Sequence, residues 1–582
     1  MKKQLVFPLI LSLLLSAGCA KQTFVDVPKE TDTNHTAANK DLFTNRDRET
    51  DYSEGKSVRI RFDGNTATAS SDSVNINGST VTITGEETYI FSGSLDHGKV
   101  IVDAGKKDKL QLVLEGVTVN SDTIALEILE ADKVFITLAE GTQNQLTASE
   151  AAVYSKQDLT FNGSGSLTVT STASHGITCK DDLVFTGGSY QIQSASHGLD
   201  ANDSIRITGN TAMILDAGKD GIHCENQDDS EQGFVYVEQG NLKITAQGDG
   251  ISAGAYAHIS DGSFEITAGG GSVNGSKDHS DFFGGFMGGG GGRPGFRSTA
   301  QQTTADESSS MKGIKAVGAI TVDGGNFILD TADDAIHSNT AVTVAGGTFR
   351  IKSGDDAFHA EETLEVTAGT VHIETSYEGL EAHKVYVRGG ELEIHANDDG
   401  INAAGGQDNS GVGGGRDGMF GGGHAGGPGG RAPFGGSSSD GLIEISGGNL
   451  KIYSSGDCLD ANGNITISNG YIYATNPTSG DTSVLDSDTG AVITGGTFIG
   501  AAASTMMAHS FEQSSTQGVL AGTVGSQKAG TLVTVTDTAG NTLISFEAEY
   551  DFVLVILTAP EIKKGEAYTL TVGELTHTTQ AA

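Results

Sequence analysis

The sequence predicts an all-β fold, a parallel β-helix with three strands in each coil of about 22 residues, closed by a small β-rich domain at its C-terminal end. Three observations lead to this prediction. A turn ending in glycine recurs at a fixed interval, as at Gly325, Gly347 and Gly369. Apolar and polar residues alternate between these turns, and amphipathic helical patterns are hard to find. A fixed period without helices is typical of a solenoid built from strands.

One repeat unit, DDAIHSNTAVTVAGGTFRIKSG, contains three strand-like segments, AIHS, AVTV and TFRI. Within them Val342, Val344, Phe349 and Ile351 would face the core, while the residues between them face outward. Equivalent residues of successive coils would then stack about 4.8 Å apart. Roughly six buried apolar side chains do not offset the entropy of ordering one coil, so each coil depends on its neighbours for stability.

Two glycine-rich inserts, at 269–310 and 404–439, interrupt the period, which resumes once they are removed. We assign 57–500 to the β-helix. Residues 501–582 lose the period and have the alternation of hairpins, so we expect an antiparallel β cap there. The inserts fit either interaction loops or low-complexity insertions.

The N-terminus has the pattern of a targeting segment. Two lysines precede an apolar run, and the sequence Ala-Gly precedes Cys19. This order is typical of a bacterial lipoprotein signal, so we predict a signal segment over 1–19 that ends at a lipidated Cys19. An ordinary secretory signal with an incidental cysteine is the alternative. Residues 20–56 are polar, and we expect a disordered tether that holds the protein on the extracytoplasmic face of a bacterial membrane or on the cell surface.

The chain carries a net charge of −39. Such a surface repels nucleic acid and anionic membranes and attracts cations, so we expect no nucleic-acid partner and no membrane contact beyond the lipid anchor. Beyond Cys19 the cysteines are Cys179, Cys224 and Cys458, and this odd number implies no disulfide framework. We expect a monomer.

Aligned repeat units place an acidic residue at one position in most coils. Asp356 holds this position in SGDDAFHAE, and five consecutive coils carry a carboxylate there, from Asp334 to Asp457, although Lys312 interrupts the wider line. Carboxylates about 4.8 Å apart repel by roughly 3–4 kcal/mol at an effective dielectric of 20. Calcium takes about six to eight oxygen ligands, so such a line attracts it. We therefore predict calcium ligands at Asp220, Asp249, Asp333, Asp334, Asp355, Asp356, Glu378, Asp398, Asp399 and Asp457.

Two alternatives stay open for this part of the repeat. Aspartate beside glycine often caps its own backbone in a turn, so turn chemistry would also explain the acids. His223, His337 and His359 form an outward line on neighbouring coils, for which we expect a solvated polar face, with ligand contact or a transition-metal site as the alternative. The candidate ligand-binding residues are His337 and His359 together with tyrosines able to stack on sugars, Tyr377, Tyr386, Tyr453, Tyr471 and Tyr473.

The repeated S-G-D-D-G-I-H-A turn, the I-T-G-G turn, the lipoprotein-like start and the Gly/Met/Phe/Pro-rich inserts resemble one family over residues 60 to 580. It is the bacterial carbohydrate-binding domain family of β-helix proteins, described first from a cellulolytic clostridium. The resemblance implies a right-handed parallel β-helix with calcium sites along one side, binding to cellulose and to acidic sugars such as polygalacturonate, and no catalysis. The sequence departs from the family pattern at Lys312, Tyr377 and Glu378.

The expected function is therefore a surface lipoprotein that binds polysaccharide with calcium and is not an enzyme. Pectin-degrading enzymes share this fold, so a calcium-dependent polysaccharide lyase is one alternative. A lyase needs a basic residue as proton acceptor, for which Lys312, Lys315, Lys384 and Arg388 are candidates by position. A calcium-stiffened surface adhesin without sugar specificity is the other alternative.

Overall fold

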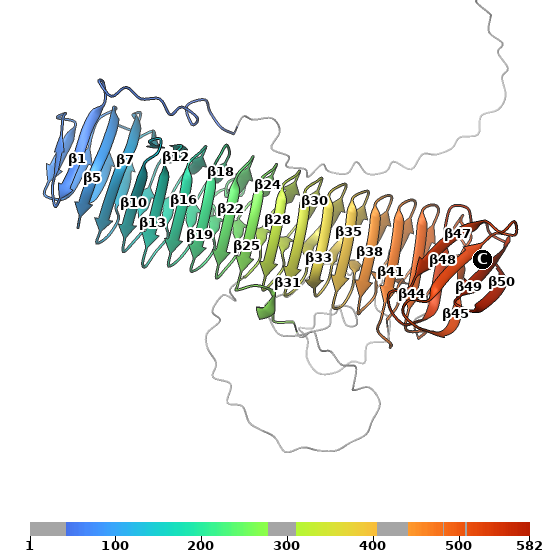
Figure 1. Cartoon of the computed structure of the whole chain (residues 1–582). Helices are drawn as coiled ribbons and strands as arrows, with labels where there is room; N and C mark the ends of the chain where they lie inside the picture. Colours follow the sequence, from blue (N-terminus) through green and yellow to red (C-terminus); the bar gives the residue numbers. More distant parts are fainter. Residues whose placement is uncertain (1–41, 278–309, 404–439, 481, 507–508) are drawn as a thin grey trace, which may run out of the picture. The chain divides into compact units, whose positions relative to one another are not determined.

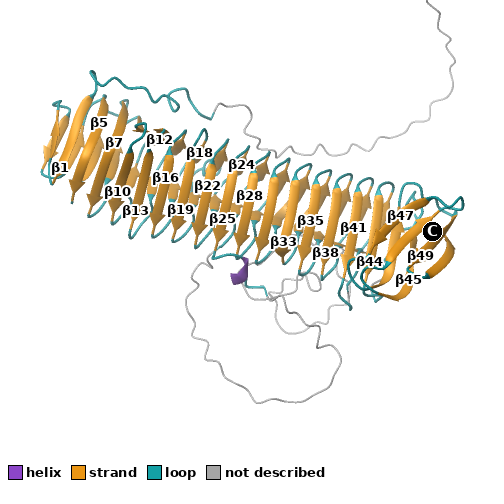
Figure 2. Cartoon of the chain, in the orientation of Figure 1, coloured by secondary structure: helices purple, strands orange, loops and turns teal. Residues whose placement is uncertain are grey.

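The computed structural model describes residues 42–277, 310–403, 440–480, 482–506 and 509–582, all within one compact unit, Asp41–Ala582. The predicted signal segment 1–19 with Cys19, the insert 404–439 and most of the insert 269–310 lie outside these residues. The described part is built from strands and loops, with one short helix, η1 (Ser272–Asn274) (Figure 2). Within the described ranges, no helix has the length and apolar character needed to cross a membrane.

The strands form a parallel β-solenoid, which confirms the predicted fold (Figure 1). One coil consists of three strands, β29 (Ile336–Ser338), β30 (Ala341–Val344) and β31 (Thr348–Ser353). Each strand pairs in parallel with its counterpart one coil further along. Ile336 lies beside Phe358 and Phe349 beside Val371, so the step is 22 residues in both strands (336 to 358, 349 to 371). The period read from the glycine turns is therefore the length of one coil.

Stacked coils give the solenoid three faces. The second face extends from β9 (Lys133–Leu138) to β43 (Gly490–Ile493), and the third from β10 (Gln143–Ala148) to β44 (Thr497–Ala502). The first face carries the candidate site described below. From β14 onward its strands are β14 (Ile177–Cys179), β17 (Leu199–Ala201), β20 (Ile222–Cys224), β23 (Ile251–Ala253), β26 (Ile314–Ala316), β29, the first part of β32 (Phe358–Val366), the first part of β34 (Leu380–Val387), β36 (Ile401–Ala403), β39 (Leu459–Ala461) and β42 (Asp486–Ser487).

The core consists of side chains stacked in register from coil to coil. Phe264, Phe327 and Phe349 stack face to face, with ring centroids 4.8 Å and 4.5 Å apart. Phe358 meets Phe349 edge-on at 5.6 Å and is fully buried, as its place in the repeat predicts. Such aromatic pairs stabilise the fold by about 0.5–1.5 kcal/mol each beyond the area they bury. Because each ring contacts its neighbours along the axis, the core extends without a break through the coils.

The C-terminal end is antiparallel, as the loss of the period predicts. β44 pairs in parallel with β41 (Tyr471–Asn476) but antiparallel with β48 (Phe552–Thr558), so the solenoid sheet continues into the cap. β45 (Leu520–Gln527) follows β48 at the outer edge. A separate four-stranded sheet contains β47 (Thr542–Glu547), β46 (Leu532–Thr536), β49 (Ala567–Val572) and β50 (Leu575–Gln580), in that order.

Residues 42–49 form a strap across the second face. Asp47 is buried, where its Oδ1 accepts a hydrogen bond from Oγ1 of Thr160 at 2.7 Å and lies 2.9 Å from Nζ of Lys133. Phe43 is also buried, with its ring centroid 5.9 Å from that of Tyr236. The strap is thus held at both ends by groups that water does not reach.

The expected disordered tether over 20–56 is therefore wrong for residues 42–49. The physical reason lies on the second face, where Phe135 points away from the core and still needs cover. The guanidinium of Arg46 lies 4.9 Å from its ring centroid, and Phe135 is only 2% exposed. The buried side chains of Phe43 and Asp47 order this polar segment, and the composition of the segment does not reveal their contacts.

We predict that Asp47→Ala releases the strap. The change leaves the half-buried Lys133 ammonium without its counter-charge, and removing one partner of a buried pair costs up to about 3–5 kcal/mol. Trypsin should then cleave after Arg46 or Arg48 at least about ten times faster than in the unchanged protein, since 1.4 kcal/mol is roughly a factor of ten. Glu49→Ala, which removes an exposed partner of Arg46, is the control and should leave the rate unchanged. Equal cleavage of the Asp47→Ala and unchanged proteins would show that the pair does not hold the strap.

Candidate metal centre

The aligned acidic position of the repeat forms a continuous line beside the first face, which we call the acid ladder. Each member lies in the turn that leads into a first-face strand. Its side chains come from consecutive coils and therefore succeed one another along the solenoid axis. The members are His175, His197, Asp220, Asp249, Lys312, Asp334, Asp356, Glu378, Asp399 and Asp457.

In most coils one atom of the acid-ladder side chain accepts a hydrogen bond from the backbone of the next coil, although the Lys312 ammonium cannot do so. Oδ1 of Asp220 accepts the backbone N–H of Asp249 at 2.8 Å, and Oδ1 of Asp334 accepts that of Asp356 at 3.1 Å. Nδ1 of His197 has the same role toward the backbone N–H of Asp220, at 3.3 Å. A side chain thus supplies the acceptor that the turn lacks, since a buried backbone N–H needs a partner. The position therefore favours aspartate and histidine, both of which accept.

In two coils a glycine, Gly248 or Gly456, precedes the acid, and this bond explains it. A Cβ at Gly248 would collide with Oδ1 of Asp220, and a Cβ at Gly456 would collide with the carboxylates of Asp398 and Asp399. The acids therefore cap the backbone of the next coil more than their own. Since one oxygen is enough for this bond, the second oxygen of each carboxylate stays available for a cation.

A second line of side chains lies three residues further along, in the first-face strands, and we call it the strand ladder. Backbone pairing places its members directly beside one another from coil to coil. They are Thr178, Asp200, His223, Ser252, Lys315, His337, His359, Glu381, Asn402, Asp460 and Asp486.

The histidines of the strand ladder are more buried than expected. His337 and His359 are 8% and 0% exposed, so the expected solvated face is wrong at these coils. Their rings stack with centroids 4.7 Å apart. Nδ1 of His337 lies 2.7 Å from Oδ2 of Asp334, and Nδ1 of His359 lies 2.7 Å from Oε2 of Glu381. Neighbouring carboxylates hold both rings inward, which the repeat pattern alone does not show.

His359 serves as a buried cation. Burial would lower its pKa, but Asp356 and Glu381 raise it well above the usual range. Burial would likewise raise the pKa of Glu381, but His359 holds it below its ordinary value, so these two form an ion pair. Burial, together with Asp355, raises the pKa of Asp356 well above its ordinary value.

Two lysines neutralise the middle of the acid ladder. Nζ of Lys312 lies 3.0 Å from Oδ2 of Asp333 and 2.5 Å from Oδ2 of Asp334. Nζ of Lys277 lies 2.8 Å from Oδ1 of Asp355. Burial would raise the pKa of Asp334, but Lys312 holds it well below its usual range. Ammonium groups therefore stand beside these carboxylates, where the sequence predicted calcium.

In the N-terminal part of the acid ladder, too, cationic side chains lie beside the carboxylates. Oδ2 of Asp220 lies 3.2 Å from Nδ1 of His197, and although burial would raise the pKa of Asp220, His197 lowers it. Asp249 is 2% exposed and lies 3.7 Å from Nζ of Lys315. Burial raises the pKa of Asp249 despite this lysine. A calcium ion here would have to displace cationic side chains.

The C-terminal part of the two ladders differs, because acids there adjoin one another. We call Asp399, Asp457, Asp460 and Asp486 the C-terminal acid cluster. Carboxylate oxygens of the last three lie within 4.8 Å of one another. Among the described residues, the one ion pair of this cluster joins Oδ1 of Asp486 to Nδ1 of His509, at 2.7 Å. Its negative charge is therefore largely uncompensated by the protein.

The raised pKa values of these carboxyls reflect their burial and their uncompensated negative charge. Burial and the neighbouring Asp460 raise the pKa of Asp457 to about 8. Burial and Asp486 raise the pKa of Asp460 to about 7, and burial and Asp460 raise that of Asp399 well above its usual range. A bound cation would favour the ionised carboxylates, offsetting both the burial and the repulsion that raise these pKa values.

Asn402 adds a neutral oxygen beside the C-terminal acid cluster. It pairs in register with Asp460 and is 1% exposed. Its Nδ2 donates to Oε2 of Glu378 at 2.9 Å, but its Oδ1 has no hydrogen-bond partner in the described part of the chain. An unsatisfied buried acceptor costs about 1–3 kcal/mol, and amide oxygens are calcium ligands.

The structure corrects the expected sugar-stacking role of two tyrosines. Tyr453 and Tyr473 are each 7% exposed and pack beneath the C-terminal cap. The hydroxyl of Tyr453 donates to Oε1 of Glu549 at 2.9 Å, and the ring of Tyr453 stacks on His395 with centroids 4.6 Å apart. The cap covers the third face at this point, so neither ring is available to a glycan.

The other three tyrosines lie apart from one another. Nζ of Lys277 lies 4.6 Å from the ring centroid of Tyr377, and the guanidinium of Arg388 lies 5.0 Å from that of Tyr386. Tyr471, on the third face, is 42% exposed. These rings do not form one stacking platform.

The sequence prediction missed five residues of the two ladders and their surroundings. Asp460, Glu381 and Asn402 each lie three residues after an acid-ladder position, so a search at that offset would have found them. Asp486 follows from the same register one coil later. Lys277 borders a long insert, and no periodic signal points to it.

Together, stacked coils and two parallel lines of charged side chains define a parallel β-helix protein with a linear polar face. The chain belongs to the family of carbohydrate-binding domain-containing proteins, whose sequence profile matches residues 77–357 and 356–545. A protein of that name from Acetivibrio thermocellus is 37% identical over 211 residues, which cover 34% of this chain and 73% of the relative. The solved structure of a polysaccharide lyase-like protein from C. thermocellum, a gadolinium derivative, is 33% identical with a TM-score of 0.35, covering 37% of this chain and 92% of that one.

We predict that the C-terminal acid cluster makes stability fall as pH rises when cations are removed. Asp457 and Asp460 bind protons in the native state up to pH 8 and 7, whereas unfolded aspartate loses its proton near pH 3.9, so the native state binds more protons between these limits. The expected loss from pH 5 to pH 8 is on the order of several kcal/mol, because each pKa unit corresponds to about 1.4 kcal/mol. Thermal unfolding in excess chelator measures it.

The variant Asp457→Asn plus Asp460→Asn should flatten this dependence. A control that removes two exposed charges, Asp228→Asn plus Glu231→Gln, should retain it. If the first variant keeps the full slope, the two aspartates do not carry the raised proton affinity.

Proposed function

We propose that this protein is a lipid-anchored surface protein that binds polysaccharide, either cellulose or an acidic uronate glycan, through a calcium-loaded first face, and that it does not cleave its ligand. The observation that carries the proposal is the C-terminal acid cluster, whose half-buried carboxylates converge with little compensating charge. Membership of the carbohydrate-binding domain family supplies the class of ligand.

The donor set of the cluster fits calcium. Calcium prefers carboxylate and amide oxygens, in a flexible arrangement that tolerates several acids. Asp457, Asp460 and Asp486 would hold the ion, with Asp399 and the Oδ1 of Asn402 as further donors. The coils around His337 and His359 also contain carboxylates, but lysine and histidine cations already pair with them, so these coils suit calcium less well.

The role of the ion follows from the charge of the chain. At a net charge of −39, a uronate polymer is repelled unless a divalent cation lies between its carboxylates and those of the protein. Bound calcium would supply that positive charge at the C-terminal acid cluster, whose carboxylates are half-buried.

The candidate bases argue against catalysis. A lyase needs a basic group that accepts a proton near the substrate. Lys312 is buried in ion pairs with Asp333 and Asp334, which raise its pKa although burial would lower it, so it is a poor proton acceptor. Arg388 lies between Glu365 and Glu444. Binding without cleavage is therefore the better match to these residues.

Lipid anchoring completes the proposal. The predicted lipidated Cys19 would attach the chain to the extracytoplasmic face of a bacterial membrane or cell surface. The residues after Cys19 that precede the strap at 42–49 would connect the anchor to the solenoid. Anchoring in this way would hold the protein where extracellular glycans occur.

We predict that polygalacturonate binding requires calcium and the C-terminal acid cluster. Binding of the polymer to the purified protein, measured by calorimetry or affinity electrophoresis, should appear with calcium and vanish in excess EGTA. Asp457→Asn plus Asp460→Asn should weaken it at least about tenfold, whereas Asp228→Asn plus Glu231→Gln should leave it unchanged, because loss of one well-made charged contact costs about 1.4 kcal/mol or more.

Three results would speak against parts of the proposal. Full binding in EGTA would contradict the calcium bridge. Calcium binding without affinity for polygalacturonate or cellulose would favour the surface adhesin. Release of unsaturated sugar, detected by its ultraviolet absorbance, would identify a lyase.

A further inference from the structure

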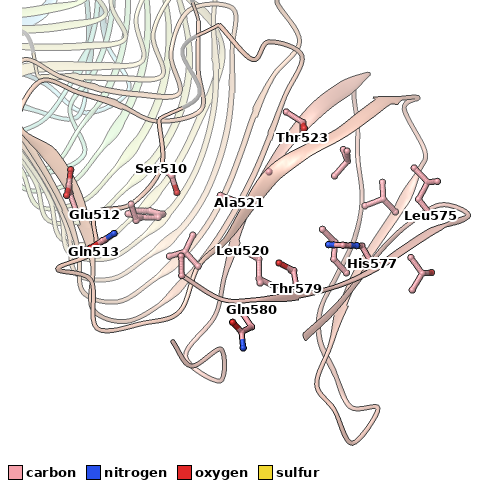
Figure 3. A pocket seen from close by; sticks show the side chains of 18 residues that line it. Ser510, Glu512, Gln513, Leu520, Ala521, Thr523, Leu575, His577, Thr579 and Gln580 are labelled. Carbon is pink, nitrogen blue, oxygen red and sulfur yellow. The ribbon is translucent and has the colours of Figure 1, made fainter. Parts of the chain in front are cut away.

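A slot opens in the C-terminal cap, away from the two ladders. It is a cavity of about 650 Å³ between β45 and β50, and its wall also includes residues 510–513 and part of β49. Figure 3 shows Leu520, Ala521 and Thr523 on one side and Leu575 and His577 on the other. Nothing in the proposed polysaccharide function uses this slot.

The two strands that flank the slot are both sheet edges. β45 pairs with β48 on one side, and β50 pairs with β49 on one side. Their ends meet, because the N–H of Val519 donates to the carbonyl of Ala582 at 3.2 Å and the N–H of Ala582 donates to the carbonyl of Val519 at 2.9 Å. In the described residues no further backbone bond joins β45 to β50, so the strands separate beyond this pair.

Backbone alternation shows which groups face the slot. In an antiparallel strand the N–H and C=O of one residue point to the same side, and those of the next residue point to the other. Since Val519 faces β50, the backbones of Ala521 and Thr523 face it too. By the same rule, Gln580 and Thr578 face β45, because Ala582 does. Both walls of the slot therefore present rows of backbone donors and acceptors.

The floor of the slot is apolar and nearly uncharged. Leu520, Val524, Leu570 and Val572 line it, and Leu575 is 57% exposed. At Gly522, between Leu520 and Val524, a Cβ would meet no atom within 4 Å, so the space above the strand is open. Among the lining side chains, Glu512 is the one acid, in a chain with a net charge of −39.

We propose that this slot binds an extended polypeptide segment of another protein, which adds as a strand to β45. The backbone rows on the walls call for an occupant with its own regular N–H and C=O groups, and a polypeptide strand has them at the matching spacing. The apolar floor selects small or β-branched apolar side chains at alternate positions of that segment. A glycan would leave the apolar floor and the backbone rows poorly matched.

The test uses a display library of random ten-residue peptides panned against the intact purified chain. Enriched peptides should alternate β-branched apolar residues with polar ones. Hydrogen exchange of the bound chain should slow in the segment 519–524, at the amides of Ala521 and Thr523. The dissociation constants of the enriched peptides, measured by fluorescence polarisation, give the affinities to be compared among variants.

Two blocking variants act by different means. Thr523→Pro removes a backbone N–H that faces the slot and makes no bond to β48, and Gly522→Phe fills the open space above the strand. Each should weaken peptide binding at least tenfold. Thr542→Phe, on the edge strand β47 of the four-stranded sheet, is the matched control and should retain affinity within twofold.

Several outcomes would overturn the proposal. One is that the library yields no peptides that prefer the unchanged chain over Thr523→Pro. Another is that both blocking variants bind the peptides as tightly as the unchanged chain. A third is that bound peptide slows hydrogen exchange in β47 and not in β45. Displacement of the peptides by oligogalacturonate would also overturn it, because the slot would then belong to the glycan site.

Discussion

In most coils the backbone N–H of the acid-ladder residue donates a hydrogen bond to the acid-ladder side chain of the preceding coil, and the site depends on this interaction. It joins neighbouring coils at a turn where no backbone carbonyl is available to accept the N–H. Examples are the bonds between Asp220 and Asp249 and between Asp334 and Asp356. It requires a short accepting side chain at the same position in successive coils, and it brings carboxylates close together along one line. The first face is therefore acidic because of how the coils are joined, before any ligand is considered.

Close carboxylates need positive charge, and the chain supplies it unevenly along the axis. Histidines and lysines pair with many of the acids from Asp220 to Glu381, with Lys312 and His359 as the most buried cations, whereas burial keeps the pKa values of Asp249, Asp356 and Glu378 raised. Beyond Asn402, the C-terminal acid cluster relies on protons or on an external cation, as the raised pKa values of Asp457 and Asp460 indicate. One repeated structural bond thus gives two kinds of coil, those neutralised by the protein and those that remain able to bind a metal.

Much of this could be predicted from the sequence, because a solenoid repeats its contacts. The 22-residue step, the inward place of Phe358, the antiparallel cap and the aligned acids all follow from periodicity. Contacts that occur once could not be predicted in this way. Lys277 beside Asp355, the strap held by Asp47 and the cover over Tyr453 each join segments distant in sequence. The burial of His359 was missed because an outward register position was taken to mean exposure to solvent.

The central claim is that an external cation binds at the C-terminal acid cluster and not beside the lysines. Anomalous diffraction from crystals grown with strontium, a calcium substitute, tests it directly. The account predicts an anomalous peak in contact with the carboxylates of Asp457, Asp460 and Asp486, and none between Lys312 and Asp333. A peak beside Asp333 and Asp355 with Lys312 and Lys277 displaced, or no peak at the C-terminal acid cluster, would contradict it.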